Sequence, residues 1–192
     1  MILSRPLVVG SNSPRRKEIM ASAGFEFTVM VRPTDEVFPE DLPAHEVPVY
    51  LASLKAACFE GEMDEAIILC ADTVVIVDGR ILNKPASREE AVSMLKSLSN
   101  KTHQVVTGVC IKTGEEYDTF SDTAFVSFKD LSDEEIAYYL DTCHPFDKAG
   151  SYGVQDFIGM IGIPKIEGSF YTVMGLPVHL VYEHLKKYIQ WN

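Results

Sequence analysis

Short apolar runs and helical patterns alternate along the first part of this chain. The expected elements are a strand at 7–9, a helix at 14–23, a strand at 25–31, a loop at 32–47, a helix at 48–59 and a strand at 67–71. This alternation indicates an α/β fold, because each helix has to bury its apolar side against a sheet. Since 46% of the 192 residues are hydrophobic, the chain can bury a substantial core, as one compact domain or as two closely joined lobes.

Turn and cap signals organise the rest of the chain. Asp78-Gly79 tolerates the positive φ angles of a tight hairpin turn, and Ser-x-x-Glu capping boxes at Ser87 and Ser132 open two helices. The expected elements are strands at 73–77 and 80–82, a helix at 88–98, strands at 103–111 and 119–128, a helix at 133–141, loop and short strand through 149–168, and a helix at 177–189. The middle segments are expected to add an antiparallel pair to the sheet.

Acidic side chains outnumber basic ones, with 28 Asp and Glu against 17 Lys and Arg and a net charge of -11. This balance opposes nonspecific attraction to nucleic acid or to an anionic membrane, so any anionic ligand must meet a local basic site. The four cysteines form no C-x-x-C pair, which is typical of reduced thiols in an intracellular protein. Since no secretory signal or bilayer-spanning apolar run is visible, we expect a soluble, cytoplasmic protein.

A basic cluster follows the first strand, where a loop leads into a helix. Ser13 is expected to cap this helix and Gly24 to end it. Backbone N–H groups at a helix start attract phosphate, and five side chains would add donors or charge there: Ser11, Ser13, Arg15, Arg16 and Lys17. The stretch is neither a G-x-x-x-x-G-K-[ST] loop nor a G-x-G-x-x-G turn. Either the cluster binds phosphate or its basic side chains form a solvated helix face.

Asp72 follows an apolar run and is expected to end a strand. A carboxylate at a strand end could hold a divalent metal or take a proton from water, because such ends open onto clefts in α/β folds. The alternative is that Asp72 caps the following turn with its side chain. Lys84, before Pro85, is either a surface charge or a phosphate ligand facing the same cleft.

A third segment reads HPFDKAGSYGVQ over residues 144–155. Asp147 and Lys148 precede three small residues that would let the backbone approach a ligand closely, and Tyr152 is expected to be buried. The alternative is a turn with a surface ion pair between these two charged neighbours. The five histidines of the chain show no metal-ligand spacing, so we expect them to be polar or packing residues.

Six motifs in order along nearly the whole chain resemble the Maf family of nucleotide pyrophosphatases. They are S-x-S-P-R-R-x-E-I at 11–19, A-D-T-V-V at 71–75, K-P at 84–85, L-S-x-x-x-H-x-V-x-T-G at 98–108, D-K-A-G-x-Y-G-x-Q at 147–155 and G-L-P at 175–177. The resemblance implies a mixed α/β fold with two lobes around a deep cleft, related to inosine triphosphate pyrophosphatases. It also implies Mg²⁺- or Mn²⁺-dependent hydrolysis of nucleoside triphosphates to monophosphate and pyrophosphate.

The resemblance further implies roles for individual residues. Asp72 corresponds to the catalytic proton acceptor and, with Glu36, to the metal ligands. The positions associated with the phosphates are Ser11, Arg15, Arg16, Lys55 and Lys84, and those linked to base selection are Arg15, Thr73 and Gln155. A homodimer is compatible with the resemblance.

The motifs favour the branch of the family that acts on dTTP and UTP over the branch that acts on 7-methyl-GTP. The Gln155 amide offers one donor and one acceptor, which complement the O4 and N3–H edge of uracil or thymine. Asp156 departs from the small residue common at its position and leaves the fine specificity open. A nucleotide-binding regulator of cell division without turnover is the rival interpretation, while the net charge disfavours a nucleic-acid-binding module.

Overall fold

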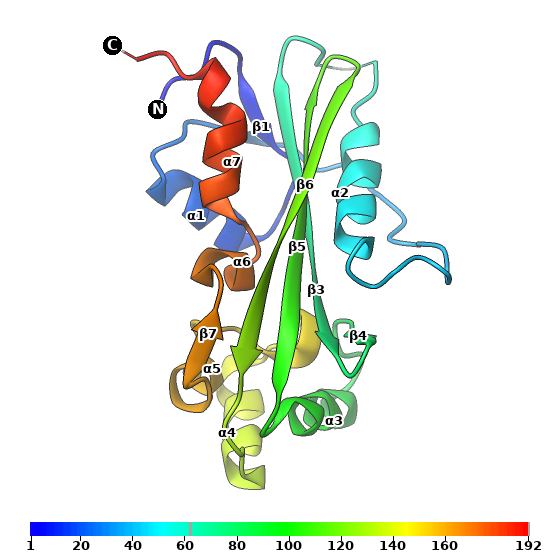
Figure 1. The fold of residues 1–192 in the computed structure, drawn as a ribbon, viewed down its shortest axis with the longest axis vertical. Coiled ribbons are helices and arrows are strands. Elements are labelled where there is room, and N and C mark those ends of the chain that lie inside the picture. Colours follow the sequence, from blue (N-terminus) through cyan, green and yellow to red (C-terminus); the bar gives the residue numbers. More distant parts are fainter. Residues whose placement is uncertain (62, 192) are drawn as a thin grey trace. The chain divides into compact units, whose positions relative to one another are not determined.

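The computed structural model describes residues 1–61 and 63–191. Over these residues it is a mixed α/β fold in which seven strands form one sheet, with the order β2-β1-β3-β5-β6-β7 and with β4 paired to β3 (Figure 1). The chain divides into two compact units, and the long strands β3, β5 and β6 each contribute residues to both. The mixed α/β class is confirmed, and the cleft stays a prediction.

The first unit comprises Met1–Asp72, Thr107–Asp122 and Gly175–Asn192. Its complete elements are β1 (Leu7–Val9), α1 (Pro14–Ser22), β2 (Thr28–Val29), α2 (Val47–Ala57), α7 (Val178–Leu185) and the 3₁₀ turn η2 (Lys186–Tyr188). It also contains the beginning of β3 (Ile67–Val77), the end of β5 (Thr102–Thr113) and the beginning of β6 (Glu116–Ser127). Strand β1 pairs in parallel with both β2 and β3. Figure 1 shows α2 on one side of these strands and α1 and α7 on the other.

Helix α1 ends as its sequence predicts but begins differently. At its C-terminus, Gly24 adopts a φ of +82°, and the N–H groups of Gly24 and Phe25 bond to the carbonyls of Ala21 and Met20. This is the Schellman arrangement, which requires a left-handed residue after the helix. At its N-terminus, Ser13 holds the cap position, yet its side chain makes no capping bond to any described residue. The expected side-chain cap is therefore wrong, while the helix start is confirmed.

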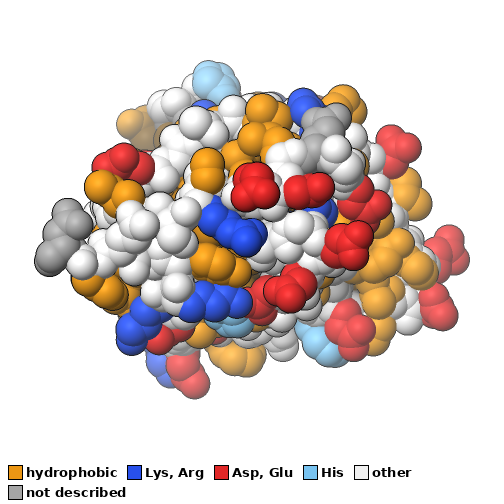
Figure 2. All heavy atoms as spheres, turned by 90° about the horizontal axis from the view of Figure 1, so that it is seen from above, with side chains coloured by type: hydrophobic (Ala, Val, Ile, Leu, Met, Phe, Trp, Pro, Cys, Tyr) orange, Lys and Arg blue, Asp and Glu red, His pale blue; other side chains and the backbone are white. Residues whose placement is uncertain are grey.

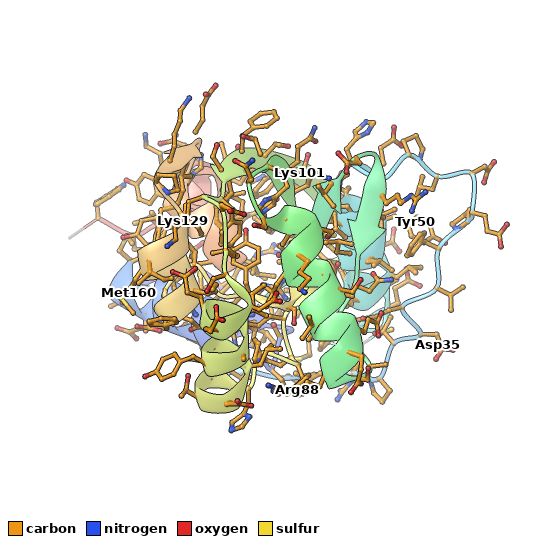
Figure 3. The ribbon with its side chains drawn as sticks, turned by 90° about the horizontal axis from the view of Figure 1, so that it is seen from below. Asp35, Tyr50, Arg88, Lys101, Lys129 and Met160 are labelled. Atoms are coloured by element: carbon orange, nitrogen blue, oxygen red, sulfur yellow. The ribbon has the colours of Figure 1, made fainter. Side chains whose placement is uncertain are left out.

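The second unit comprises Thr73–Val106 and Thr123–Met174. Besides the remainders of the three long strands, its elements are β4 (Arg80–Leu82), α3 (Arg88–Leu98), α4 (Asp133–Cys143), the 3₁₀ turn η1 (Ala149–Ser151), α5 (Phe157–Gly162), β7 (Lys165–Glu167) and α6 (Phe170–Met174). The core packs side chains of α3 and α4 against strand residues such as Val75, Val105 and Val126. Arg88, labelled in Figure 3, lies at the start of α3 and pairs with Asp141 of α4 at 2.6 Å.

The two expected capping boxes differ in detail. Ser132 and Glu135 exchange both bonds, as the motif predicts, and the helix they open runs on to Cys143. Ser87 accepts from the N–H of Glu90, but the Glu90 carboxylate bonds to the N–H of Ala86 instead of the cap residue. The Ser87 motif therefore starts its helix at the expected residue, but Glu90 does not bond back to the N–H of Ser87.

The structure differs from several expected elements, because sequence patterns do not show tertiary packing. The strand expected at 25–31 is only Thr28–Val29. The segment 149–168 contains helix α5 besides loop and strand, because Ile158 is fully buried in the core of the second unit. Helix α6 was not expected, and the last helix ends at Leu185 before a 3₁₀ turn.

Among the described residues, no helix is long and apolar enough to cross a membrane. On the face drawn in Figure 2, acidic and basic side chains lie interspersed with apolar ones.

Candidate active site

Three charged side chains meet in the first unit. The Lys55 ammonium lies 2.6 Å from Oδ1 of Asp72 and 2.7 Å from Oε1 of Glu36. The side chains of Lys55 and Asp72 are only 17% and 15% exposed, whereas Glu36 is 48% exposed. One cation therefore holds two carboxylates together, and the two acids that the sequence proposes as metal ligands are brought to one place.

The position of Asp72 follows from strand geometry. Alternate residues of a strand face the same side of a sheet, so Ile68, Cys70 and Asp72 share a face. Ile68 and Cys70 pack against Ala52 and Ala56 of α2. Lys55 lies in the same helical stripe, so it reaches the next residue along that face of β3.

The expectation that Asp72 ends a strand is wrong. Strand β3 runs without interruption from Ile67 to Val77, so Asp72 lies in its middle. Its first part, at 67–69, pairs with β1 and its last part, at 75–77, pairs with β4, while β5 is its other neighbour in the sheet. The alternative role, in which Asp72 caps the turn, is wrong for the same reason.

Glu36 lies on the long loop between β2 and α2, and this loop is anchored beside the C-terminal end of α2. The Arg32 guanidinium lies 5.4 Å from the centre of the Phe59 ring, and the Cys58 thiol is 3.7 Å from the Pro33 carbonyl. Figure 3 shows Asp35, the neighbour of Glu36, on the extended part of this loop. These contacts place Glu36 within reach of Lys55.

The loop between β1 and α1, which leads into the basic cluster, is packed tightly against β3. The Gly10 N–H bonds to the Leu69 carbonyl at 2.8 Å, and a β-carbon at Gly10 would lie 2.5 Å from the Cys70 sulfur. Only glycine allows this approach. Burial also raises the pKa of Cys70 to about 12, so its thiol stays protonated and acts as a packing group.

Ser11 and Arg16 form the ordered part of the basic cluster. The buried Ser11 hydroxyl accepts from the N–H of Ser13 at 3.2 Å and from Nη1 of Arg16 at 3.3 Å. Nε of Arg16 donates to the carbonyl of Gly175 at 2.8 Å. Arg16 is thus held at both its Nε and its Nη1, which contradicts the solvated-face alternative for this residue.

The charge of Arg16 acts on Asp72, which with Glu36 forms the acidic centre of the site. Burial lowers the pKa of Arg16, while Asp72 raises it and Arg15 lowers it again. An arginine stays protonated at neutral pH under such shifts. A half-buried positive charge beside Asp72 supplies the local basic site that an anionic ligand would need in a protein whose net charge is -11.

The other proposed site residues belong to the second unit. Thr73 follows Asp72 in β3, while Lys84 and Gln155 are both exposed. The carbonyl of Asn83, next to Lys84, accepts from the N–H of Gly150 at 3.2 Å. The loop after β4 is therefore attached to the segment that leads to Gln155.

The segment 147–156 is more than a turn with a surface ion pair. Lys148 bonds to Asp147 at 2.8 Å, as the alternative interpretation has it, but its side chain is only 12% exposed. Its Nζ also lies 3.7 Å from Oδ2 of Asp156. Gly150, with a φ of +65°, packs against Val75, whose side chain would lie 3.0 Å from an added β-carbon. The small residues serve close packing within the unit.

His103 forms a buried pair with Tyr152 of this segment. Nε2 of His103 lies 2.7 Å from the Tyr152 hydroxyl, and the imidazole stacks on Phe128. Burial lowers the pKa of His103 to about 4 and raises the pKa of Tyr152, so both groups are neutral at pH 7. This confirms His103 as a packing residue and Tyr152 as buried.

The buried imidazole predicts a loss of stability in mild acid. The folded-state pKa of about 4 lies below the ordinary histidine pKa of 6.5, so the unfolded chain binds the proton more readily between these pH values. The contribution is present above pH 6.5 and is lost as the pH falls, by roughly 2–3 kcal/mol between pH 7 and pH 4.5. Urea unfolding of wild type and His103→Gln at both pH values measures it. The variant should lose less stability than wild type, whereas the exposed control His45→Gln should match wild type.

The donor set fits a hard divalent cation that is shared with a substrate. The carboxylates of Asp72 and Glu36 converge on one point, which Lys55 now fills. In the part of the chain that the structure describes, no group of three or more His, Cys, Asp or Glu side chains could hold a metal. Mg²⁺ typically takes one or two carboxylates and completes its shell with water and phosphate oxygens, which matches two acids beside the expected phosphate site.

Sequence reasoning missed how Tyr139 is used. Its place among Ile136 and Leu140 identifies it as a core residue of α4, and it is fully buried. Its hydroxyl nevertheless contacts Gly153 and Asp156, on either side of Gln155. A helical pattern shows which face is buried but not where a buried hydroxyl finds its partners.

Comparisons with known proteins test the family resemblance. Residues 6–188 match the family model described as Maf-like protein. A protein of Porphyromonas gingivalis named dTTP/UTP pyrophosphatase is 51% identical over 190 residues, covering 97% of this chain and 96% of that protein. A protein of Bacteroides thetaiotaomicron with the same name is 48% identical over 94% of this chain and 95% of that protein, and one of Cytophaga hutchinsonii is 44% identical over 94% and 83%. Because the family model and these relatives match nearly the whole length of the chain, the chain belongs to the Maf family.

Proposed function

We propose that this protein hydrolyses dTTP and UTP to the nucleoside monophosphate and pyrophosphate. The observation that carries the proposal is the similarity over 97% of the chain to a relative named for this activity. The acidic centre and the ordered arginine supply the chemistry that such a reaction requires. A regulator that binds nucleotide without turnover would need the basic cluster alone.

The reaction is a displacement at the α-phosphorus. A water oxygen forms a bond to this phosphorus while the bond to the bridging oxygen breaks, and pyrophosphate leaves with the electron pair. Asp72 orients the water and accepts its proton; in its alternative role it would hold the divalent cation. Arg15 and Arg16 stabilise the negative charge that builds up on the leaving group. We assign Lys84 to the phosphates, and Thr73 and Gln155 to the base.

Asp72 and Glu36 would hold the divalent cation, Mg²⁺ or Mn²⁺. When bound, it would neutralise charge on the triphosphate and polarise the scissile phosphoryl group. Lys55 would then leave the two carboxylates and turn to the phosphates, which offer it replacement oxygens.

A product assay tests the proposed reaction. Purified protein is incubated with Mg²⁺ and each of UTP, dTTP, CTP, ATP, GTP and 7-methyl-GTP, and pyrophosphate is measured against orthophosphate. Pyrophosphate in equal amount to UMP or dTMP is the expected result. Orthophosphate as the product, binding without turnover, or a preference for 7-methyl-GTP would contradict the proposal.

Base selection is expected to depend on Gln155. A wrong base would leave buried polar groups unpaired, at roughly 1–3 kcal/mol for each group. CTP reverses the donor and acceptor pattern, and rotation of the amide would partly compensate, so CTP is the closest competitor. Gln155→Ala should lower kcat/KM for UTP and dTTP by about tenfold or more, with a smaller effect on purine nucleotides. Steady-state kinetics of the two proteins over the same panel gives the comparison, and an unchanged base preference would contradict the assignment.

We further infer a soluble, cytoplasmic enzyme whose partner is the nucleotide, with no role for nucleic acid or membrane. The net charge of -11 supports this, because it disfavours polyanionic partners. A homodimer rests on the family resemblance, and sedimentation analysis would test it.

A further inference from the structure

The segment that presents Gln155 is buried except for Gln155 itself. Ser151 to Val154 are buried, Gln155 is exposed and Asp156 is half-buried. Gln155 therefore projects from backbone that has little room to move. Whatever fixes the backbone on either side of it also fixes the direction of the amide.

One hydroxyl binds both sides of this position. The Tyr139 hydroxyl accepts the N–H of Gly153 at 3.0 Å and donates to Oδ2 of Asp156 at 2.9 Å. Gly153 lies two residues before Gln155 and Asp156 directly after it. The two hydrogen bonds thus bracket Gln155 and tie it to helix α4.

The surroundings of the Tyr139 hydroxyl keep it protonated. Tyr139 is fully buried, and burial followed by the nearby charge of Asp156 raises its pKa, so it stays protonated and remains a donor. Lys148 Nζ lies 3.7 Å from the same Asp156 oxygen and offsets its charge. A bond from a neutral donor to a carboxylate is stronger than one between neutral groups.

Gly153 makes room for the acid. A β-carbon at this position would lie 2.5 Å from Oδ2 of Asp156 and would displace the carboxylate from Tyr139. Glycine at 153 and aspartate at 156 are therefore coupled choices. Asp156, which leaves specificity open when the sequence alone is considered, has a definite partner in the structure.

We propose that Tyr139 and Asp156 form a clamp that positions Gln155 and thereby sharpens selection of the base. This rests on the proposed function, in which Gln155 contacts the base. Neither clamp residue reacts with the nucleotide, so both are positioning residues. Loosening the clamp leaves the phosphate chemistry intact but lets the amide of Gln155 point in several directions.

Two effects are expected from Tyr139→Phe, which keeps the ring and removes the hydroxyl. The kcat/KM for UTP should fall about fivefold or more, mainly through KM, while that for GTP should change less, so the UTP/GTP ratio declines. Hydrogen exchange at the Gly153 amide should become faster, because this N–H loses its acceptor. Asp156→Ala should reproduce the lower ratio, while the Gly153 N–H keeps its acceptor and should exchange more slowly than in Tyr139→Phe. Asp156→Asn should restore most of the ratio by still accepting the bond, and the double variant Tyr139→Phe/Asp156→Ala should have a ratio no lower than the single ones.

The matched control is Tyr138→Phe on the same helix. Tyr138 is 56% exposed and packs its ring against Phe157, so loss of its hydroxyl should change neither the ratio nor the exchange. Melting temperatures show whether each variant is folded. If Tyr139→Phe does not fold, Asp156→Ala and Gly153→Ala test the same clamp from the loop side.

The outcomes separate the clamp from the proposed function. A reduced ratio with faster Gly153 exchange supports the clamp. A ratio that changes in Gln155→Ala but not in Tyr139→Phe overturns the clamp and keeps the assignment of Gln155. A ratio that Gln155→Ala itself leaves unchanged overturns base contact by Gln155 and, with it, the selectivity role of the clamp.

Discussion

Asp72→Asn should leave a folded protein that turns over dTTP and UTP at least about a hundredfold more slowly, the scale of loss for a central electrostatic group. The substitution keeps the shape of the side chain and removes the charge needed to orient water or hold the cation. The fold should survive because Asp72 is neither in a core cluster nor the sole partner of Lys55, which retains Glu36 at 2.7 Å. Single-turnover kinetics at saturating nucleotide measures the chemical step directly.

Asp78→Asn is the matched control for this experiment. Asp78 also pairs with a lysine, Lys101, at 2.6 Å, but it is 67% exposed and lies on a hairpin turn with a φ of +50°, which asparagine tolerates. Its activity should equal that of wild type. If Asp72→Asn kept more than about a tenth of the wild-type rate, well above the loss expected for such a group, the role assigned to Asp72 would be wrong.

Lys55→Met should have two opposite effects. Turnover should fall by about a hundredfold, because an ammonium that serves the phosphates is lost. Binding of Mn²⁺ to the protein without nucleotide should become tighter, by about tenfold or more, because two carboxylates that shared one cation are left with an uncompensated charge. In wild type, a cation has to displace Lys55 from contacts of 2.6 and 2.7 Å.

Titration of Mn²⁺ followed by electron paramagnetic resonance would measure this affinity apart from turnover. Mn²⁺ should also raise the melting temperature of Lys55→Met more than that of wild type, since a ligand stabilises the state that binds it. Lys96→Met removes an exposed lysine paired with Asp133 and should leave metal affinity unchanged. Weaker Mn²⁺ binding by Lys55→Met would show that the carboxylates do not form the metal site.

The order of elements could be predicted from the sequence where local signals mark their ends. Gly24 and the Asp78-Gly79 pair both adopt positive φ, and the helix at Arg88–Leu98 starts and stops at the expected residues. Local signals do not mark the end of strand β3 correctly. Asp72 and Thr73 interrupt an apolar run, which resembles a strand end, but the strand continues to Val77 between several partner strands. Which partner a strand finds is tertiary information.

The candidate site was predictable only in part for a related reason. Charge and spacing draw attention to Arg16 and Asp72, whereas Lys55 and Glu36 enter only through the family resemblance. Neither has a local signature, since one is a lysine on an apolar helix and the other an acid on a loop with several acids. Their meeting depends on the stripe of α2 that packs on β3, and that register cannot be read from either segment alone.

The two acids of the site lie on different kinds of backbone element. Asp72 projects from the middle of an eleven-residue strand, whereas Glu36 projects from a loop that contacts the segment after α2 through Arg32 and Pro33. A carboxylate on a strand keeps its place whether or not a ligand is present, and one on a loop can follow the ligand inward. We expect the strand acid to set where the reaction takes place, and the loop acid to adapt to cations of different radius, so that a single site could use either magnesium or manganese.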